Sequence, residues 1–583
     1  MSRPVRDPFP VRSPIRGRIP LLAVLLLVLL PVACEPGGEA DGDGEAGRDV
    51  SSREPVVDFA PSADWATYGG DPGQRRFTRL PGLDAEAAGR MERAWSVGTG
   101  VPGIFEATPV AVGGRLYVST PTRGGEQRVL KLDGATGERV WERRIEIGSA
   151  RPEPTRTSRG VAVGGGRVYL ATLDARLIAL DTADGADLWE TRTSDPSAGY
   201  QHKQAPLFRD GRVYLGVSGG PLGIRGFVKA FDAETGRELW TWHSIPSPEQ
   251  GGWWGEWVDT LPGTSVPLHR ELERERADSA RYADSWRRGG GAVWMTPTLD
   301  PERGLLFVSV GNPAPELTDR SRPGDNRWTS SVCALRTEDG SRAWCRQIVP
   351  HDVWGMDAAS PPFLLTHGDT IPAVGHFSKL GTLYVWDRRD GRLLTVSESY
   401  VPRENFLARP TTEGVRMAPG LYGGTEWSPG SYSPRTGLAY TAALHAPGRY
   451  FVRTRGPREG TTGFDLGPAD ERWGVLAAVD PTTGRVAWTD RTERPMVAGS
   501  LVTAGDVVFA GLLSGGLAAW DARTGERLWT GPAEFPCASA PAAYQADGRP
   551  FVALACGGHF LAGGGTGDQV VAFTPSVGEA GGD

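Results

Sequence analysis

The stretch AAWDARTGERLW, residues 518–529, is the strongest indication of the fold, because versions of it recur along most of the chain. Each copy joins a β-rich run, usually an aspartate, a glycine-containing turn and a final aromatic or apolar run. Alternating runs joined by such turns predict antiparallel hairpins. The other copies are LKLDGATGERVW (130–141), IALDTADGADLW (178–189), KAFDAETGRELW (229–240), CALRTEDGSRAW (333–344), AAVDPTTGRVAW (477–488) and a degenerate YVWDRRDGRLLT (384–395).

The repeats predict a closed ring of sheets. A single four-stranded sheet cannot bury both faces, so stacked blades are the stable arrangement, with the repeat tryptophan packed between neighbours. A further blade can be assembled from residues 568–575 and the segment 93–97, which carries Trp95. We therefore expect an all-β, eight-bladed β-propeller of four-stranded antiparallel blades, closed by pairing of the N- and C-terminal strands.

Composition and missing motifs exclude several classes of function. The 583 residues carry a net charge of −7 and no long basic run follows the N-terminal segment, which argues against nucleic-acid binding. The eight histidines show no close metal-ligand spacing, and no nucleophile elbow or phosphate-binding loop is present. No C-x-x-C-H motif occurs, so we expect no covalent haem.

The N-terminus is typical of an exported protein. A basic start and an apolar run predict a signal peptide over 1–33, and Cys34 follows it as the lipidated residue of a lipoprotein would. Pro31 departs from the usual pattern, so an incidental cysteine in an exported protein is the alternative. Residues 34–60 read as a flexible tether and 61–583 as the propeller.

Two further features belong to the predicted propeller domain. The charged, alanine-containing segment near 267–288 predicts a helical insertion, either a plain surface helix or a lid. The other cysteines form two pairs, each placed symmetrically about a turn. Either two disulfides or four buried thiols fit the pairs Cys333–Cys345 and Cys537–Cys556.

Several stretches resemble the PQQ-dependent quinoprotein dehydrogenases. These are the repeat itself, DWATYGGDPGQRRFTRL (64–80), EATPVAVGGRLYVST (106–120), the run GGGAVW…GNPAPELTDRSRPGDNRW (289–328) and GDQVVAFTP (567–575). The resemblance covers most of 62–575. It implies an eight-bladed propeller with noncovalent PQQ and usually Ca²⁺ on the axis, and oxidation of alcohols or sugars in the periplasm.

The resemblance assigns site residues one by one. Arg159 suits a PQQ carboxylate, because a guanidinium binds carboxylates in bidentate fashion. Trp294 offers a flat floor for a planar quinone, and Lys379 lies where a cation would stabilise charge on the reduced cofactor. Asn312 matches an amide ligand of Ca²⁺. The full set of implied cofactor residues is Glu106, Arg159, Ser218, Gly219, Gly220, Trp294 and Lys379.

Each of these residues also has an ordinary structural interpretation. Glu106 could be a turn acid, Arg159 a loop arginine, Trp294 a blade-packing aromatic, and Asn312 part of an Asn-Pro turn. Ser218, Gly219 and Gly220 would then be a glycine-rich turn.

The sequence also departs from the family pattern. Pro221 replaces a metal-binding glutamate, and Glu426 stands where an asparagine contacts the cofactor. In HDVWGMDAAS (351–360), Gly355 occupies the position of the catalytic aspartate. Asp357 is the nearest downstream acid, and it is either a substitute base acting with Lys379 or a structural loop residue, because a base must reach its proton.

Two functions remain open at this point. One is a divergent quinoprotein that oxidises an alcohol or sugar and passes electrons to a membrane quinone or a cytochrome. The alternative is a non-catalytic propeller lipoprotein that binds a ligand or a protein, as outer-membrane assembly lipoproteins do. In both cases we expect a bacterial envelope protein on the periplasmic side, held to the membrane by a lipid anchor only.

Overall fold

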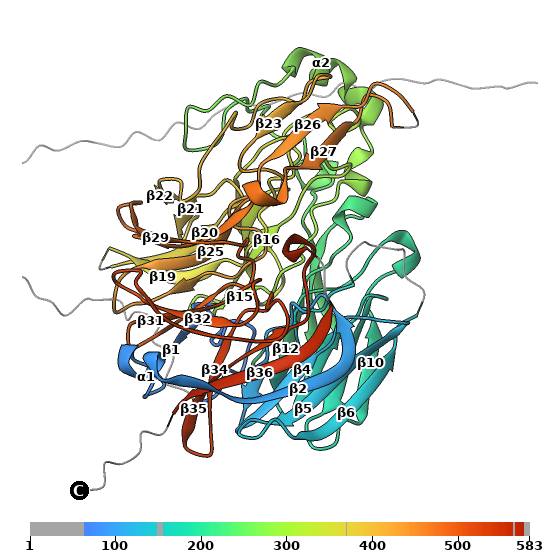
Figure 1. Ribbon diagram of the computed structural model, residues 1–583. Helices are drawn as coiled ribbons and strands as arrows, with labels where there is room; N and C mark the ends of the chain where they lie inside the picture. The colour runs from blue at the N-terminus through green and yellow to red at the C-terminus, as the bar shows by residue number, and fades with distance from the viewer. Residues whose placement is uncertain (1–62, 149–155, 369, 457, 564–565, 577–583) are drawn as a thin grey trace, which may run out of the picture. The chain divides into compact units, whose positions relative to one another are not determined.

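The computed structural model describes residues 63–148, 156–368, 370–456, 458–563 and 566–576. The predicted signal peptide, the tether and Cys34 lie outside the described residues. The described chain is all-β apart from short helices, and its sheets are the four-stranded antiparallel sheets of a propeller-like fold (Figure 1). Among the described residues, no helix is long and apolar enough to cross a membrane.

The first four blade sheets follow the chain in simple order, each a meander of consecutive strands. Their bounds are β3 (Val110–Val112), β4 (Arg115–Ser119), β5 (Glu126–Asp133) and β6 (Arg139–Glu146); β7 (Ala162–Gly164), β8 (Arg167–Ala171), β9 (Arg176–Asp181) and β10 (Asp187–Arg192); β11 (Leu207–Arg209), β12 (Arg212–Leu215), β13 (Phe227–Asp232) and β14 (Glu238–His243); β15 (Thr298–Asp300), β16 (Leu305–Val310), β17 (Ser331–Arg336) and β18 (Arg342–Gln347).

The later blade sheets follow the same plan with additions. Their bounds are β19 (Phe363–His367), β20 (Ile371–Phe377), β21 (Leu383–Asp387) and β22 (Leu393–Val396); β24 (Ser431–Tyr432), β25 (Ala439–His445), β28 (Trp473–Val479) and β29 (Val486–Thr492); β30 (Ser500–Thr503), β31 (Val507–Gly511), β32 (Leu517–Asp521) and β33 (Arg527–Gly531), with β1 (Phe77–Thr78) added in parallel to β30.

One sheet combines the two ends of the described chain. β2 (Met91–Gly103) pairs with β36 (Gly567–Pro575), which continues through β35 (Arg549–Cys556) to β34 (Ala542–Ala546). The register places Trp95 opposite Ala572. Figure 1 shows the blue β2 alongside the red β36. The pairing removes the open edge that a terminal strand would otherwise expose.

The repeat motif explains how neighbouring sheets contact each other. In most repeats the indole N–H of the tryptophan donates to a turn carbonyl of the next sheet, as Trp344 Nε1 does to Arg388 O at 3.1 Å. Its ring covers the turn glycine, and a Cβ on Gly391 would lie 2.6 Å from Trp344. Glycine is therefore needed in the turn for packing as well as for its left-handed backbone. Equivalent bonds join Trp95 to Gly134, Trp141 to Thr182, Trp189 to Ala233, Trp240 to Thr337 and Trp488 to Ala522.

Two contacts between sheets differ from this pattern. The degenerate repeat has Thr395 in place of tryptophan, and its hydroxyl donates to the carbonyl of Thr482. The ring of Trp529 packs edge-on against Phe573 of β36, with centroids 5.3 Å apart. Apolar side chains fill the spaces between sheets, so the core is divided among the interfaces between neighbouring blades.

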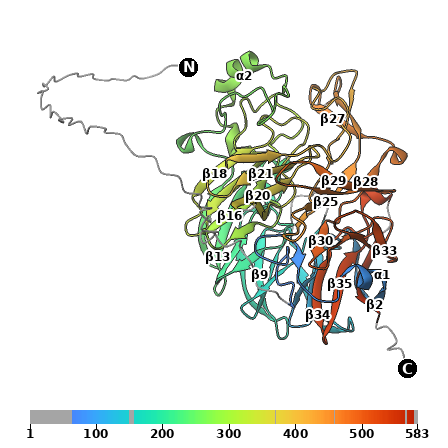
Figure 2. The same ribbon diagram turned by 90° about the vertical axis from the view of Figure 1, so that its left-hand side faces the viewer.

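Insertions carry the remaining elements. A three-stranded sheet of β23 (Val415–Met417), β26 (Gly448–Val452) and β27 (Thr462–Leu466) lies near α2 (Leu272–Asp278), at the end of this unit away from β34 (Figure 2). The remaining helices are α1 (Ala85–Gly89) and the 3₁₀ turns η1 (Pro196–Ala198), η2 (Gly220–Leu222), η3 (Pro248–Gln250), η4 (Ser279–Tyr282), η5 (Ser285–Arg288), η6 (Ala469–Glu471) and η7 (Phe560–Ala562).

Both cysteine pairs are disulfide-bonded. Cys333 and Cys345 lie directly opposite each other on β17 and β18. Cys537 precedes β34 and reaches Cys556 at the end of β35. The two bonds therefore fasten loops or strands within single sheets.

Candidate functional site

The antiparallel order of each sheet gathers particular loops at one edge. The segment before a first strand and the segment after a second strand lie at the same end of a meander. Segments before first strands carry Glu106, Arg159, Trp294, Asp357 and Glu426, and segments after second strands carry Ser218, Asn312, Lys379 and His559.

These loops line one cavity of about 600 Å³. Its wall contains every site residue that the sequence suggested for cofactor, metal or catalysis. They are Glu106, Arg159, Ser218, Gly219, Gly220, Trp294, Asn312, Asp357 and Lys379. Residues from many different loops thus share one space, as a ligand-binding site requires.

Arg159 lines the cavity, and some of its hydrogen-bond donors remain unpaired in the described chain. Its Nη2 lies 2.8 Å from Glu106 Oε2, and both side chains are about 5% exposed. The guanidinium lies 4.9 Å from the Trp294 ring centroid and 5.1 Å from that of Trp427. Within the described residues its Nε and Nη1 are buried without a hydrogen-bond partner. Buried donors of a charged group are costly to leave unpaired, so this arginine is suited to an anionic ligand.

Lys379 is a second buried cation that lines the cavity. Its Nζ lies 2.6 Å from Asp357 Oδ1 and 3.4 Å from Glu426 Oε1, and it donates to the carbonyl oxygens of Gly355 and Leu421 at 3.1 and 3.2 Å. Burial alone would lower the pKa of Lys379, but the charges of Asp357 and Glu426 outweigh it and raise that pKa. The lysine therefore stays charged inside the cavity.

Both carboxylate oxygens of Asp357 interact with neighbouring side chains. Besides the ion pair with Lys379, its Oδ2 accepts a hydrogen bond from Trp294 Nε1 at 3.2 Å. These contacts orient the indole and the ammonium group relative to each other. Asp357 thus has a clear positioning role, which the sequence left open beside that of a substitute base.

The loop that contains Gly355 is fixed by Asp352 and Arg322. Asp352 Oδ1 accepts from the backbone N–H groups of Trp354 and Gly355 at 2.9 and 3.1 Å, and its Oδ2 accepts from Asn312 Nδ2 at 2.8 Å. Arg322 donates to the carbonyl oxygens of Asp352 and Pro315, at 2.5 and 2.9 Å. One arginine therefore joins the two loops that meet beneath the cavity.

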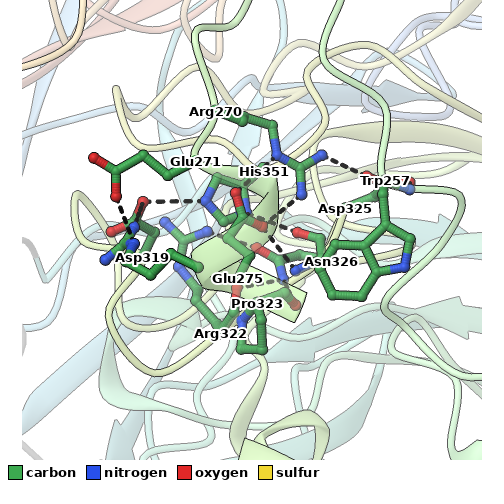
Figure 3. Close-up of polar contacts among 12 residues, drawn as sticks. Trp257, Arg270, Glu271, Glu275, Asp319, Arg322, Pro323, Asp325, Asn326 and His351 are labelled. Carbon is green, nitrogen blue, oxygen red and sulfur yellow. Dashed lines mark hydrogen bonds and ion pairs between the residues drawn. The ribbon is translucent and has the colours of Figure 1, made fainter. Parts of the chain in front are cut away.

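An ionic network outside the cavity supports these loops (Figure 3). The buried Arg270 forms ion pairs at 2.6 Å with Glu275 of α2 and with Asp325. His351 Nδ1 donates to Gly324 O at 2.7 Å, and its Nε2 lies 3.2 Å from Asp319 Oδ2. The helical insertion thus stabilises the start of the loop that carries Gly355 and Asp357.

The structure adds cavity residues that sequence reasoning missed. Glu316 is the most informative, because burial raises its pKa to about 7, with further raising by Asp357, Asp352 and Glu426 and an opposing effect of Lys379. It lies inside the GNPAPELTD stretch, but no pattern marked it. Other missed residues are Lys203, Tyr422, Trp427 and His559.

The predicted metal site is less complete than the cofactor site. Asn312 lines the cavity with its amide nitrogen bound to Asp352. Pro221 also lines it and has no side-chain oxygen. Across the part of the chain that the structure describes, no three histidine, cysteine, aspartate or glutamate side chains are grouped as metal ligands.

Comparisons with known proteins agree with this geometry. A family model described as "Glucose/ethanol/alcohol dehydrogenase, beta-propeller domain" matches residues 65–408, and one described as "Outer membrane protein assembly factor BamB" matches 436–579. The quinohemoprotein alcohol dehydrogenase of Comamonas testosteroni is 31% identical over 555 residues, which cover 88% of this chain and 74% of that protein.

Two further relatives extend the similarity. The lanthanide-dependent methanol dehydrogenase of Methylorubrum extorquens is 27% identical, over 83% of this chain and 85% of that protein. The crystal structure of the Comamonas testosteroni quinohemoprotein alcohol dehydrogenase matches with a TM-score of 0.74 at 28% identity, covering 88% of this chain and 81% of that one. On this evidence the chain belongs to the family of PQQ-dependent quinoprotein dehydrogenases.

Proposed function

We propose that this protein is a PQQ-dependent oxidoreductase that oxidises alcohols in the cavity described above. The observation that carries the proposal is the convergence of a buried arginine with unpartnered donors, a half-buried indole and a buried lysine on one space of about 600 Å³. A planar, anionic quinone fits these groups, because its charge suits the arginine and the lysine and its flat ring suits the indole.

The residues have distinct roles in this proposal. Arg159 binds a carboxylate of PQQ, Trp294 packs against its ring, and Glu106 keeps the arginine oriented. Lys379 faces the redox end and stabilises negative charge there. Ser218, Gly219 and Gly220 form the nearby wall. When bound, PQQ supplies an acceptor for two electrons and a hydrogen from the substrate.

The lining of the cavity favours an alcohol with an apolar chain. Ile104, Leu222, Leu421, Tyr422 and Phe560 contribute to its wall, and Phe560 is 44% exposed. Apolar side chains bind hydrocarbon groups better than they bind the hydroxyls of a sugar. A sugar remains the second substrate class, and electrons would leave to a membrane quinone or a cytochrome.

The proposal includes a metal ion, for which one protein ligand is identified. The amide oxygen of Asn312 would bind Ca²⁺, a hard cation that prefers oxygen. One relative is named as lanthanide-dependent, so a lanthanide ion is an equal candidate.

We further propose that the blades number eight and that Cys34 anchors the protein by lipid at the periplasmic side of the cell envelope. The pairing of β2 with β36 and the contact of Trp529 with Phe573 support closure of the ring. The alternative of a non-catalytic scaffold is less favoured, because a binding surface for proteins does not require a buried cavity with orphaned guanidinium donors.

Titration with PQQ tests the proposal. The wild-type protein, with Ca²⁺ or La³⁺ in separate arms, should bind PQQ saturably by absorbance and then reduce a dye with alcohols. Arg159→Lys should weaken PQQ binding about 10- to 100-fold, because lost charge-assisted hydrogen bonds are worth about 1.5–3 kcal/mol.

The matched control is Arg176→Lys, which alters a largely buried arginine–aspartate pair (Arg176–Asp174, 2.9 Å, side chains 12% and 4% exposed) away from the cavity. It should leave PQQ binding unchanged. Absence of wild-type binding in both metal arms would refute the proposed function.

A further inference from the structure

We infer that Glu316 is the general base that removes the hydroxyl proton of the substrate, in place of an acid at position 355. The inference rests on the proposed function, and it assigns a role to a residue that neither the repeat nor the family resemblance singled out.

Glu316 is the cavity carboxylate that is left available. It lines the same wall as Asp357, Lys379 and Glu426. Asp357 is occupied by Lys379 and Trp294, and Glu426 by Lys379 and the backbone N–H of Trp427. Within the described chain no ion pair or hydrogen bond holds the carboxylate of Glu316. A free carboxylate facing a cavity is able to accept a proton from a ligand.

The backbone at Gly355 explains why the acid comes from another loop. Gly355 has φ +78°, which disfavours other residues, and a Cβ built there would lie 2.1 Å from Leu421 Cδ1. The same Cβ would lie 3.4 Å from Glu316 Oε1. A side chain at 355 would therefore collide with Leu421, and it would start beside the carboxylate of Glu316, which lies at ordinary contact distance. The glycine at 355 and the glutamate at 316 are therefore neighbours, with the carboxylate supplied by Glu316.

The loop of Glu316 is rigidly connected to that of Gly355. Arg322 donates to the carbonyl of Pro315, next to Glu316, and to that of Asp352. A carboxylate can serve as a base only if its position is fixed relative to the other reacting groups. This arginine, which is fully buried, provides that connection.

The charges around Glu316 suit a base that works near neutral pH. Burial raises its pKa to about 7; Asp357, Asp352 and Glu426 also raise it, and Lys379 lowers it. Tyr422 and Tyr450 are the other titratable groups coupled to it. Above this pKa the carboxylate is ionised and ready to accept a proton.

The proton and electron balance of the step is complete. The alcohol O–H bond breaks and its proton passes to the Glu316 carboxylate. PQQ, when bound, would supply the acceptor for the carbon-bound hydrogen and two electrons, so that the substrate would leave as a carbonyl compound. Glu316 then releases its proton to solvent, ready for the next substrate.

Three variants test the assignment in the PQQ-loaded protein. Glu316→Gln should bind PQQ as tightly as wild type by absorbance but lose about 10²–10⁴-fold in turnover, the range of general-base catalysis. Wild-type kcat/KM should rise with pH through about 7, and this inflection should be absent in Glu316→Gln. In Glu316→Ala, added formate should restore part of the turnover.

Asp357→Asn distinguishes the role of Asp357 from that of Glu316. It should reduce turnover but retain the inflection of kcat/KM near pH 7. A readout independent of activity is the infrared spectrum of the PQQ-free protein between pH 5 and 9. A protonated-carboxyl band should titrate in wild type and be missing in Glu316→Gln, whose unfolding should match wild type.

The outcomes are distinguishable from failure of the proposed function. If wild type binds PQQ and oxidises alcohols while Glu316→Gln keeps its full rate, the base assignment is wrong and the proposed function stands. Loss of turnover and of the pH inflection in Asp357→Asn, with both retained in Glu316→Gln, would assign the base to Asp357. Failure of wild type to bind PQQ would refute the proposed function itself, and the infrared band would still report on Glu316.

Discussion

Replacing Lys379 by methionine is expected to remove turnover and to destabilise the folded protein by about 3–5 kcal/mol near pH 8, the cost of breaking a buried ion pair. The lysine is 6% exposed and offsets the charges of Asp357 and Glu426, which are 3% and 18% exposed. Without it these carboxylates stay in the cavity without the cation that pairs with both of them. Urea unfolding measures the stability and dye reduction measures the turnover.

The stability loss should depend on pH with a definite sign. In the variant Glu426, whose pKa burial already raises in the wild type, takes up a proton more readily when folded than when unfolded, because a buried charge without its lysine partner is costly. A raised folded-state pKa means that stability is present at low pH and is lost as pH rises. Lys379→Met should therefore cost less at pH 5 than at pH 8.

Lys229→Met is the matched control for Lys379. Lys229 lies 2.7 Å from Glu238, whose side chain is 43% exposed. Lys229 itself is 14% exposed, but its partner is open to solvent, and a pair with a solvent-exposed partner contributes about 0–1 kcal/mol, so its removal should change little. Equal losses in the two variants, or a loss at Lys379 that does not vary with pH, would contradict our account of the cavity charges.

The second large effect is expected at Arg270, outside the cavity. Its side chain is 0% exposed and lies between Glu275 and Asp325, so Arg270→Met should cost about 3–5 kcal/mol. Asp325 also accepts the backbone N–H groups of Glu256 and Val258 at 2.7 and 2.9 Å. Urea unfolding measures the loss, and limited proteolysis should show earlier cleavage in the insertion.

The control for Arg270 is Arg274→Met on the same helix. Arg274 is 42% exposed; its partner Glu271 is 64% exposed, and its second partner Asp319, 13% exposed, lies at a longer 3.3 Å and keeps its other contacts. This change should leave both stability and proteolysis near wild type. If Arg270→Met unfolded at the wild-type urea concentration, the network of Figure 3 would not stabilise the insertion as we describe.

The fold was predictable because each repeat contains the two kinds of residue that meet where neighbouring blades pack. The turn glycine and the tryptophan lie in every well-formed copy, so the sequence itself shows which residues meet, as in Gly391 and Trp344. The four-stranded antiparallel sheets are confirmed. The degenerate repeat was harder to interpret, since Thr395 replaces the tryptophan and makes a hydrogen bond instead of a ring contact.

The cavity was only partly predictable. Residues such as Arg159 and Trp294 stood in stretches that resemble a family, and the structure brings them to one wall. Glu316 lay in such a stretch too, but its role depends on its position next to Gly355 and on charges from distant loops. Trp427 and the ionic network of Arg270 likewise depend on contacts between segments far apart in the chain.

A single anaerobic turnover shows whether the cavity oxidises an alcohol with PQQ. The protein is loaded with PQQ and its metal, freed of unbound cofactor, and mixed with excess alcohol in the absence of any electron acceptor, and the carbonyl product is counted. We predict one carbonyl molecule per bound PQQ, with the absorbance change of cofactor reduction. Bound PQQ that yields no product with any alcohol or sugar would contradict the account and leave a cavity that binds the cofactor without using it.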